Sequence, residues 1–140
     1  MMVEIANQTK ININRALIER AVKAVLKFSK RHGLVSVVIV GDMAMKKLNH
    51  QYRGKNKPTD VLSFSEADSK FPDSDFIGEL VIDLSQIKRQ AKTFKHSVSF
   101  ELAFIVIHGA LHLVGYEDET EAGVLEMDRL GNSLIKKNIL

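Results

Sequence analysis

The segment that most constrains the fold is the apolar run at residues 102–114, LAFIVIHGALHLV, which is hydrophobic around nearly the whole circumference of a helix. A helix without a polar face has to be covered by other elements on most sides. We therefore expect a central, buried helix over residues 97–114. Its two histidines, His108 and His112, are expected to be buried with it, and buried imidazoles require polar partners.

The remaining segments predict strands early in the chain and helices late. Strands are expected at residues 3–6, 34–41, 60–64 and 77–83, and further helices at residues 14–31, 42–54, 85–95 and 119–137. Asn14 and Asp42 are the expected N-caps of the first two helices. The segment EADSKFPDSDF, residues 66–76, is expected to be an exposed acidic loop.

This order of elements predicts an α+β fold, in which a small mixed β-sheet carries helices on its faces. A chain of 140 residues lies near the most common size of a domain, so we expect one domain over residues 1–140. The N-terminus lacks the pattern of a signal peptide, and no apolar run is long enough to span a bilayer. We therefore expect a cytoplasmic protein with no membrane partner.

Charge is distributed unevenly along the chain. Residues 1–58 hold twelve Lys and Arg against three acids, and residues 59–140 hold eight against fourteen, so the halves carry net charges of +9 and −6. A basic half indicates a polyanionic partner such as RNA or DNA, although solvated side chains on ordinary helices explain the same count. Because the chain has no cysteine, any bound metal must be held by His, Asp or Glu.

Histidines four residues apart on a helix lie one turn above each other, with Cβ atoms roughly 5–6 Å apart, so His108 and His112 can reach one metal ion. The chain then turns, and residues 117–119 are three acids. Carboxylates beside two imidazoles predict a cation site. Gly109 stands where a metalloprotease of the H-E-x-x-H type carries its glutamate, which argues against peptide hydrolysis.

Residues 108–118, HGALHLVGYED, resemble the signature H-G-x-L-H-L-x-G-Y-D-H of the YbeY family of bacterial metal-dependent endoribonucleases. Two earlier blocks are similar to the same family, LNHQYRGKNKPTDVLSF at residues 48–64 and GELVID at residues 78–83, and the three blocks occur in the family's order. The resemblance implies a single mixed α/β domain, a zinc ion and cleavage of single-stranded RNA. It also implies a role in ribosomal RNA maturation and ribosome quality control, with ribosomal RNA and the small ribosomal subunit as partners.

The resemblance further implies which residues bind the metal. The family's ligands fall on His108, His112 and Asp118, and position 118 departs from the family's histidine. Two imidazoles and a carboxylate suit one divalent ion, zinc first, and would also admit iron, nickel or manganese. Asp118 has an alternative role, because with Glu121 three residues later it resembles a capping box at the start of the last helix.

In the second block the family's active-site arginine falls on Arg53, which can bind two phosphate oxygens and stabilise charge in a transition state. Without the surrounding motif, a surface ion pair would explain this arginine as well. Lys55 and Lys57 are expected to bind the RNA backbone. Thr59 and Asp60 are expected to form the turn and the start of the next strand rather than to act in catalysis.

Other polar and aromatic residues receive structural interpretations. Glu101 lies seven residues before His108 on the same helix face and is a candidate for orienting a ligand histidine. The remaining histidines are expected at the surface and three of the phenylalanines in the core: His32, His50 and His96, and Phe64, Phe100 and Phe104.

Two functions are consistent with these residues. The first is a metal-dependent endoribonuclease that acts on single-stranded ribosomal RNA. The second is a ribosome-associated RNA-binding or assembly factor in which the change at position 118 has weakened or abolished metal binding. Metal content, with RNA cleavage before and after metal removal, distinguishes them.

Overall fold

A computed structural model describes residues 2–68 and 75–140. In this part of the chain four strands form one sheet: β1 (Met2–Asn7), β2 (Leu34–Val40), β3 (Val61–Ser65) and β4 (Phe76–Asp83). Five α-helices accompany them: α1 (Arg15–Ser29), α2 (Asp42–Arg53), α3 (Leu84–Phe94), α4 (Val98–Leu113) and α5 (Glu121–Asn138). A short 3-10 turn, Glu66–Asp68, follows β3.

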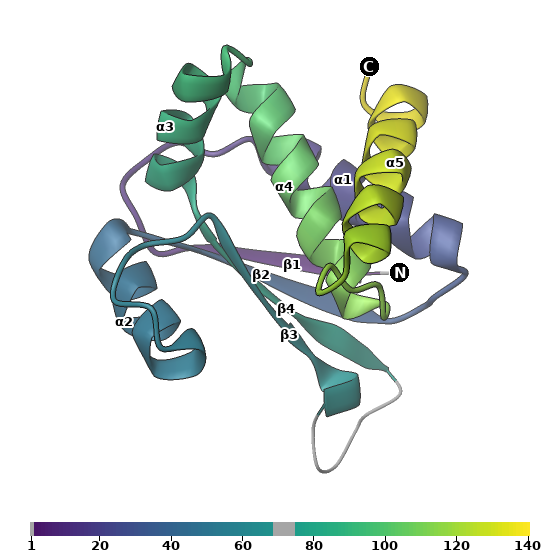
Figure 1. Cartoon of the computed structure of the whole chain (residues 1–140), viewed down its shortest axis with the longest axis horizontal. Helices are drawn as coiled ribbons and strands as arrows, with labels where there is room; N and C mark the ends of the chain where they lie inside the picture. The colour runs from purple at the N-terminus through teal and green to yellow at the C-terminus, as the bar shows by residue number, and fades with distance from the viewer. Residues whose placement is uncertain (1, 69–74) are drawn as a thin grey trace.

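The strands lie in the order β1-β2-β4-β3. β1 pairs with β2 and β2 with β4 in parallel, whereas β3 runs antiparallel to β4, with Val61 opposite Ile82 and Ser65 opposite Gly78. Helices α1, α3, α4 and α5 lie over one face of the sheet and α2 over the other (Figure 1). The predicted α+β fold, a small mixed sheet with helices on its faces, is confirmed.

Helix α4 lies at the centre of the larger helical layer and contacts α1, α3 and α5 as well as strands β3 and β4. Its buried residues belong to the main core, together with inward-facing residues of α1, β2, β4 and α5. Each fully buried aliphatic side chain contributes roughly 1.5–3 kcal/mol relative to exposure, which is why a helix that is apolar all round takes the central place. On the other face, a smaller cluster joins Met45 of α2 to Val40, Leu62 and Val81.

The predicted N-cap is confirmed at Asn14 and wrong at Asp42. Asn14 Oδ1 accepts a hydrogen bond from the Leu17 backbone N–H at 3.1 Å. Helix α2 already begins at Asp42, after Gly41. The Asp42 carboxylate instead accepts two hydrogen bonds from the Arg89 guanidinium on α3, at 2.8 and 3.0 Å. This bidentate pair ties the start of α2 to α3 and is stronger than a neutral hydrogen bond.

The acidic loop predicted at residues 66–76 is only partly described. Residues 69–74 lie outside the described residues, Glu66–Asp68 form the 3-10 turn, and β4 already begins at Phe76. Among the helices of the described ranges, none is by itself long and apolar enough to cross a membrane, and α3 with α4 reaches that length only as a pair bent by 117°.

Candidate metal centre

Helix α4 presents both histidines on one face. Ser97 caps the start of the helix, since its Oγ accepts a hydrogen bond from the Phe100 backbone N–H at 3.1 Å. The imidazole ring centroids of His108 and His112 are 4.9 Å apart. Their side chains are 24% and 23% exposed, so the prediction that both are buried is wrong. They lie where α4 borders a cavity instead of the core.

Gly109 allows α4 to approach the sheet closely. A Cβ at this position would lie 3.0 Å from Leu80 Cδ2 and 3.1 Å from Val61 Cγ2. Hydrogen bonds cross the same contact, because Ser63 Oγ donates to the Gly109 carbonyl oxygen at 3.1 Å and Ser65 Oγ donates to another α4 carbonyl at 3.3 Å. The glycine between the two histidines therefore sets the position of α4 against β3.

The turn after α4 orients His112. Gly115 has a φ of 106°, a conformation that favours glycine, and the Tyr116 backbone N–H donates to the Leu111 carbonyl at 3.1 Å. The Tyr116 carbonyl in turn accepts a hydrogen bond from His112 Nδ1 at 3.0 Å. Since a carbonyl can only accept, the hydrogen resides on Nδ1, and the Nε2 lone pair is left for a metal.

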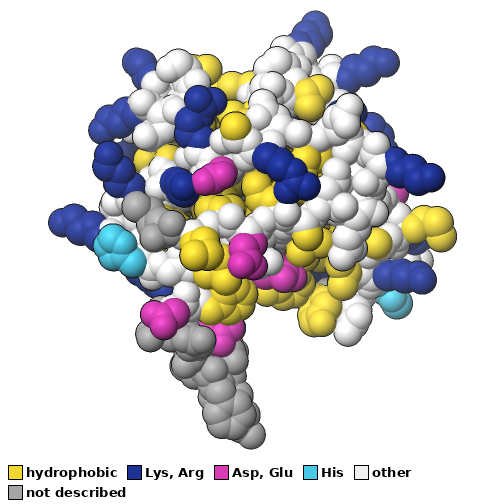
Figure 2. All heavy atoms as spheres, turned by 180° about the vertical axis from the view of Figure 1, so that it is seen from behind, with side chains coloured by type: hydrophobic (Ala, Val, Ile, Leu, Met, Phe, Trp, Pro, Cys, Tyr) yellow, Lys and Arg dark blue, Asp and Glu magenta, His cyan; other side chains and the backbone are white. Residues whose placement is uncertain are grey.

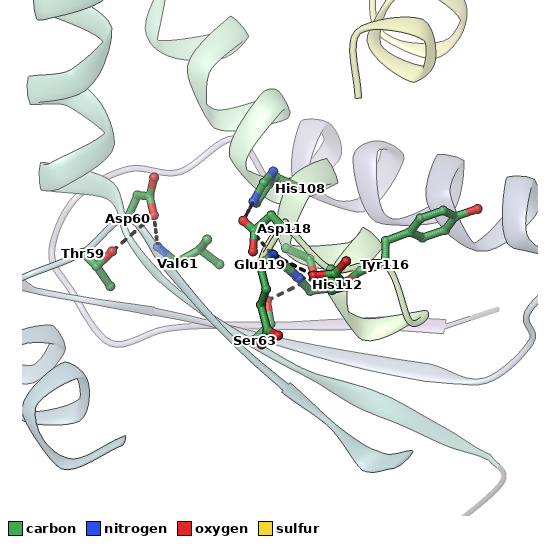
Figure 3. A network of polar contacts seen from close by, with 11 residues as sticks. Thr59, Asp60, Val61, Ser63, His108, His112, Tyr116, Asp118 and Glu119 are labelled. Carbon is green, nitrogen blue, oxygen red and sulfur yellow. Dashed lines mark hydrogen bonds and ion pairs between the residues drawn. The ribbon is translucent and has the colours of Figure 1, made fainter. Parts of the chain in front are cut away.

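Asp118 lies against both imidazoles, with its carboxylate directed toward them (Figure 3). Its Oδ2 is 3.3 Å from His108 Nε2 and 3.5 Å from His112 Nε2, and one potential ligand atom from each residue lies within 4.8 Å of the other two. Around a tetrahedral zinc ion with bonds of about 2.0–2.2 Å, neighbouring ligand atoms are roughly 3.3–3.6 Å apart. The three side chains therefore fit a divalent ion and would leave a fourth position open.

The interpretation of Asp118 as a helix cap is wrong. Helix α5 begins at Glu121, and its N-cap is Thr120, whose Oγ1 accepts a hydrogen bond from the Gly123 backbone N–H at 3.0 Å. Asp and Thr are both common N-caps, so the residue at which α5 begins decides which of the two caps it. The Asp118 carboxylate, two residues before the cap, contacts the histidines instead.

Arg53, the last residue of α2, borders the same cavity as these three residues. The cavity has a volume of about 320 Å³ and is lined by His108, His112, Asp118, Arg53, Asp60 and Asp128, among others. A second cavity of about 470 Å³ adjoins it and shares Arg53, Ser63 and His112 with it. Within residues 2–68 and 75–140, Arg53 forms no ion pair, so its guanidinium donors are available to a ligand.

A buried asparagine that the sequence interpretation overlooked holds the loop after Arg53. Asn49 Nδ2 donates to the Lys57 backbone carbonyl at 2.8 Å, and the Asn49 backbone carbonyl accepts from the Lys55 backbone N–H at 3.3 Å. The signal in the sequence was its position four residues after Met45, on the inward face of α2. The side chains of Lys55 and Lys57 are exposed, and neither lines the two cavities.

Asp60 has the structural role that was predicted. Its Oδ1 accepts a hydrogen bond from the Val61 backbone N–H at 2.7 Å, where β3 starts, and lies 3.4 Å from Thr59 Oγ1 (Figure 3). Its Oδ2 accepts from Gln90 Nε2 of α3 at 3.1 Å. Both carboxylate oxygens are therefore engaged in fixing the start of β3 beside the cavity.

Glu101 does not contact either candidate ligand, so its proposed orienting role is wrong. Its Oε1 lies 3.4 Å from His96 Nδ1, and its Oε2 accepts a hydrogen bond from Gln90 at 3.3 Å. Seven residues are two helical turns, about 10.5 Å along the axis, which is too far for contact with His108. The histidines predicted at the surface are exposed: His32, His50 and His96.

Comparison with known proteins identifies the family. The family model described as Endoribonuclease YbeY matches residues 4–138. The Endoribonuclease YbeY of Carboxydothermus hydrogenoformans is 41% identical over 124 residues, which cover 86% of this chain and 85% of the relative. The Endoribonuclease YbeY of Acholeplasma laidlawii is 35% identical over 119 residues, which cover 85% of each.

A solved structure shares the fold. The solution structure of a Thermotoga maritima protein superposes with a TM-score of 0.63 at 26% sequence identity, covering 97% of this chain and 91% of that one. The family match spans nearly the whole chain, and the curated relatives are covered over most of their length. The chain therefore belongs to the YbeY endoribonuclease family.

Proposed function

We propose that this protein is a metal-dependent endoribonuclease that cleaves single-stranded RNA. The observation that carries the proposal is the shared cavity, which His108, His112 and Asp118 line together with Arg53. The three-residue group fits a cation, and an arginine with available donors beside it fits a phosphodiester. Family membership supports RNA as the substrate, because the curated relatives are named endoribonucleases.

The metal would be held through His108 Nε2, His112 Nε2 and Asp118 Oδ2. When bound, the ion supplies Lewis-acid chemistry at the phosphate and makes coordinated water more acidic. Zinc is our first choice, and iron, nickel or manganese suit the same donor atoms. The hydrogen bond from His112 Nδ1 to the Tyr116 carbonyl would hold that imidazole in the orientation and tautomer that the metal requires.

Arg53 would bind the scissile phosphate and stabilise the negative charge that builds on its oxygens. Lys55 and Lys57 follow in the loop that Asn49 holds, outside the cavity, and would bind the backbone of the strand as it leaves the site. On the face turned away from the view of Figure 1, Lys and Arg side chains are spread over the surface without one continuous patch (Figure 2). Because the exposed Lys55 and Lys57 closely follow Arg53, we place the backbone contacts in this loop.

We extend the proposal to ribosomal RNA maturation and ribosome quality control in the cytoplasm, with ribosomal RNA and the small ribosomal subunit as partners. Family membership and the excess of positive charge in residues 1–58 support this extension. The rival function, an RNA-binding assembly factor without a working metal site, requires a weakened centre. The distances among the three donor atoms instead suit a bound ion.

The test is metal removal from the whole protein. Protein purified without chelator is analysed for metal and incubated with a single-stranded RNA and with the duplex of the same sequence, before chelation, after it, and after zinc is added back. We expect equimolar metal, cleavage of the single strand, loss of cleavage on chelation and recovery with zinc. His108→Ala should lose both metal and cleavage, whereas the matched control His32→Ala, at an exposed position, should retain both.

Two results would contradict the proposal. If RNA cleavage persists after complete metal removal, the activity does not depend on a metal held by His108, His112 and Asp118. RNA binding without cleavage, by protein that carries little or no metal even after zinc is added, would favour the assembly-factor function instead.

A further inference from the structure

Aromatic rings continue the face of α4 that carries the histidines. Phe100, Phe104, His108 and His112 occupy every fourth position of the helix and therefore share one face. Ring centroids are 6.4 Å apart from Phe100 to Phe104 and again from Phe104 to His108. Before the start of α4, the ring centroid of His96 is 4.7 Å from that of Phe100, and the ring centroid of Phe94 is 6.3 Å from that of His96. We name Phe94, His96, Phe100 and Phe104 the aromatic track.

The aromatic track is partly accessible: Phe100 and Phe104, predicted to be core residues, do pack against the main core but keep part of their surface exposed. Phe100 and Phe104 are only partly buried, as Phe64 is, and the side chain of Phe94 is 59% exposed. The track lines a depression of about 360 Å³ that also includes Glu101 and Asn132. Phe104 lines this depression and the metal cavity as well, so the two adjoin.

Exposed positive side chains lie close in sequence to residues that line the depression. Lys92 and Lys95 are exposed and flank Phe94 in the sequence. On α5, Arg129 and Lys136 lie three residues before and four residues after Asn132, and hence on the same helix face. Within the described ranges, none of these four cations forms an ion pair.

One acid lies in the depression itself. Glu101 is buried, its Oε1 is 3.4 Å from His96 Nδ1, and its Oε2 accepts a hydrogen bond from Gln90. Both of its oxygens are directed into the protein's own polar groups. The acid is therefore paired within the protein, and the aromatic rings form most of the lining of the depression.

We propose that the aromatic track is a base-stacking surface for the RNA strand that the metal centre cleaves, an inference that rests on the proposed function. A single strand offers flat bases and a charged backbone, and proteins that bind it without sequence preference combine aromatic rings with cations in this way. Stacking also accounts for single-strand preference, because paired bases cannot lie on the rings. An apolar peptide would use the rings but would leave these nearby exposed cations without partners.

The test compares a short fluorescent oligouridylate with an abasic strand of the same length and charge. Binding to both is measured with chelated protein, so that cleavage does not interfere. Wild type should bind the base-bearing strand more tightly. Phe94→Ala should weaken that binding on the order of tenfold and leave the abasic strand unaffected, as expected when one stacking ring is removed.

Two further variants keep the test decisive. Phe28→Ala is the matched control, because Phe28 is a 45% exposed phenylalanine on α1 that lines none of these cavities, and it should bind both strands as wild type does. Phe100→Leu keeps an apolar side chain that can pack against the core but removes the aromatic ring. This variant should also lose part of the preference for the base-bearing strand.

Equal binding of the base-bearing and abasic strands by wild type, or an unchanged preference in both track variants, would overturn the inference and leave the depression to a protein partner. These outcomes are separable from failure of the proposed function. A protein that prefers bases but never cleaves RNA with zinc restored would refute the nuclease and retain the stacking surface. A protein that cleaves RNA but binds base-bearing and abasic strands equally would support the nuclease and refute the stacking surface.

Discussion

Ser63 on β3 donates a hydrogen bond to the Gly109 carbonyl oxygen on α4 at 3.1 Å. This contact joins the strand that follows the Arg53 loop to the helix that carries His108 and His112. The arginine side and the metal side of the cavity are thus held together by close packing between a helix and a strand. That packing is tight at position 109, where a Cβ would lie 3.0 Å from Leu80 Cδ2 and 3.1 Å from Val61 Cγ2.

Gly109→Ala is therefore expected to lower the free energy of unfolding by up to about 2 kcal/mol, because crowding against Leu80 and Val61, about 1–3 kcal/mol, exceeds the about 0.5–1 kcal/mol that alanine gains over glycine in a helix. Gly131→Ala on α5 is the matched control, since its Cβ would meet Phe104 at an ordinary 3.7 Å. The control should be more stable than wild type by about 0.5–1 kcal/mol. Urea unfolding measures both changes, and a Gly109→Ala variant as stable as wild type would refute the close packing.

Arg53→Ala should lower the rate of RNA cleavage by a factor on the order of 10² or more, the usual cost of losing one donor to a charged transition state. Metal content and melting temperature should not change, because Arg53 is exposed and contacts no candidate ligand. Single-turnover cleavage assays measure the effect. Arg20→Ala, at an exposed position of α1, controls for the loss of positive charge, and unchanged turnover in Arg53→Ala would remove this residue from the mechanism.

Replacing both Lys55 and Lys57 by Gln should make RNA binding less sensitive to salt. For single strands, the slope of log affinity against log salt becomes shallower by roughly 0.7 for each phosphate that the protein no longer neutralises. Fluorescence anisotropy at several salt concentrations gives the slope. Lys10→Gln with Lys27→Gln removes the same charge from exposed positions elsewhere, and an equal change in this pair would show that only net charge matters.

Asp83 makes the stability of the fold dependent on pH. Burial, followed by contact with the Asp42 carboxyl, raises the pKa of Asp83 from 3.8 to about 7. The hydrogen bonds from Arg89 lower the pKa of Asp42 to about 2. Between pH 4 and 7 the folded state keeps the Asp83 proton that the unfolded state has released, so stability declines as pH rises through this window. Asp42 acts at lower pH, where stability is lost as pH falls from 3.8 through about 2.

Asp83→Asn should therefore flatten the decline in melting temperature between pH 4 and 7 and should be more stable than wild type at pH 8, by an amount on the order of a few kcal/mol. Near pH 3 the two proteins should melt alike. Asn can still cap α3 as Asp83 does through the Gln86 backbone N–H. Glu126→Gln, at an exposed position of α5, should follow the wild-type curve, and a variant parallel to wild type at every pH would exclude Asp83 as the cause.

The sequence predicted the elements better than their arrangement. Helices α1 and α4 and strand β2 lie within two residues of the expected bounds, because hydrophobic periodicity is a local property. The order β1-β2-β4-β3 could not be predicted, since β2 pairs with β4 across the intervening α2 and β3. Such pairing depends on contacts between distant segments, which no local pattern reports.

At the candidate site, spacing alone indicated a metal-binding pair at His108 and His112, and the structure brings Asp118 to them. Local sequence could not distinguish a ligand from a cap at position 118, because both Asp118 and Thr120 suit the start of a helix. Periodicity also misjudged Glu101 and the burial of the histidines. Periodicity predicts which residues share a helix face but not which residues of other elements that face contacts.

The most direct test of the metal centre is the metal content of Asp118→Ala, measured beside that of Thr120→Ala and together with the melting temperature of each. If Asp118 is the third ligand, Asp118→Ala loses most of its metal, while Asp118→His, which restores the family's residue, keeps it. Thr120→Ala should keep its metal and lose about 0.5–2 kcal/mol of stability, the usual cost of a missing N-cap. Full metal occupancy in Asp118→Ala would contradict the assignment.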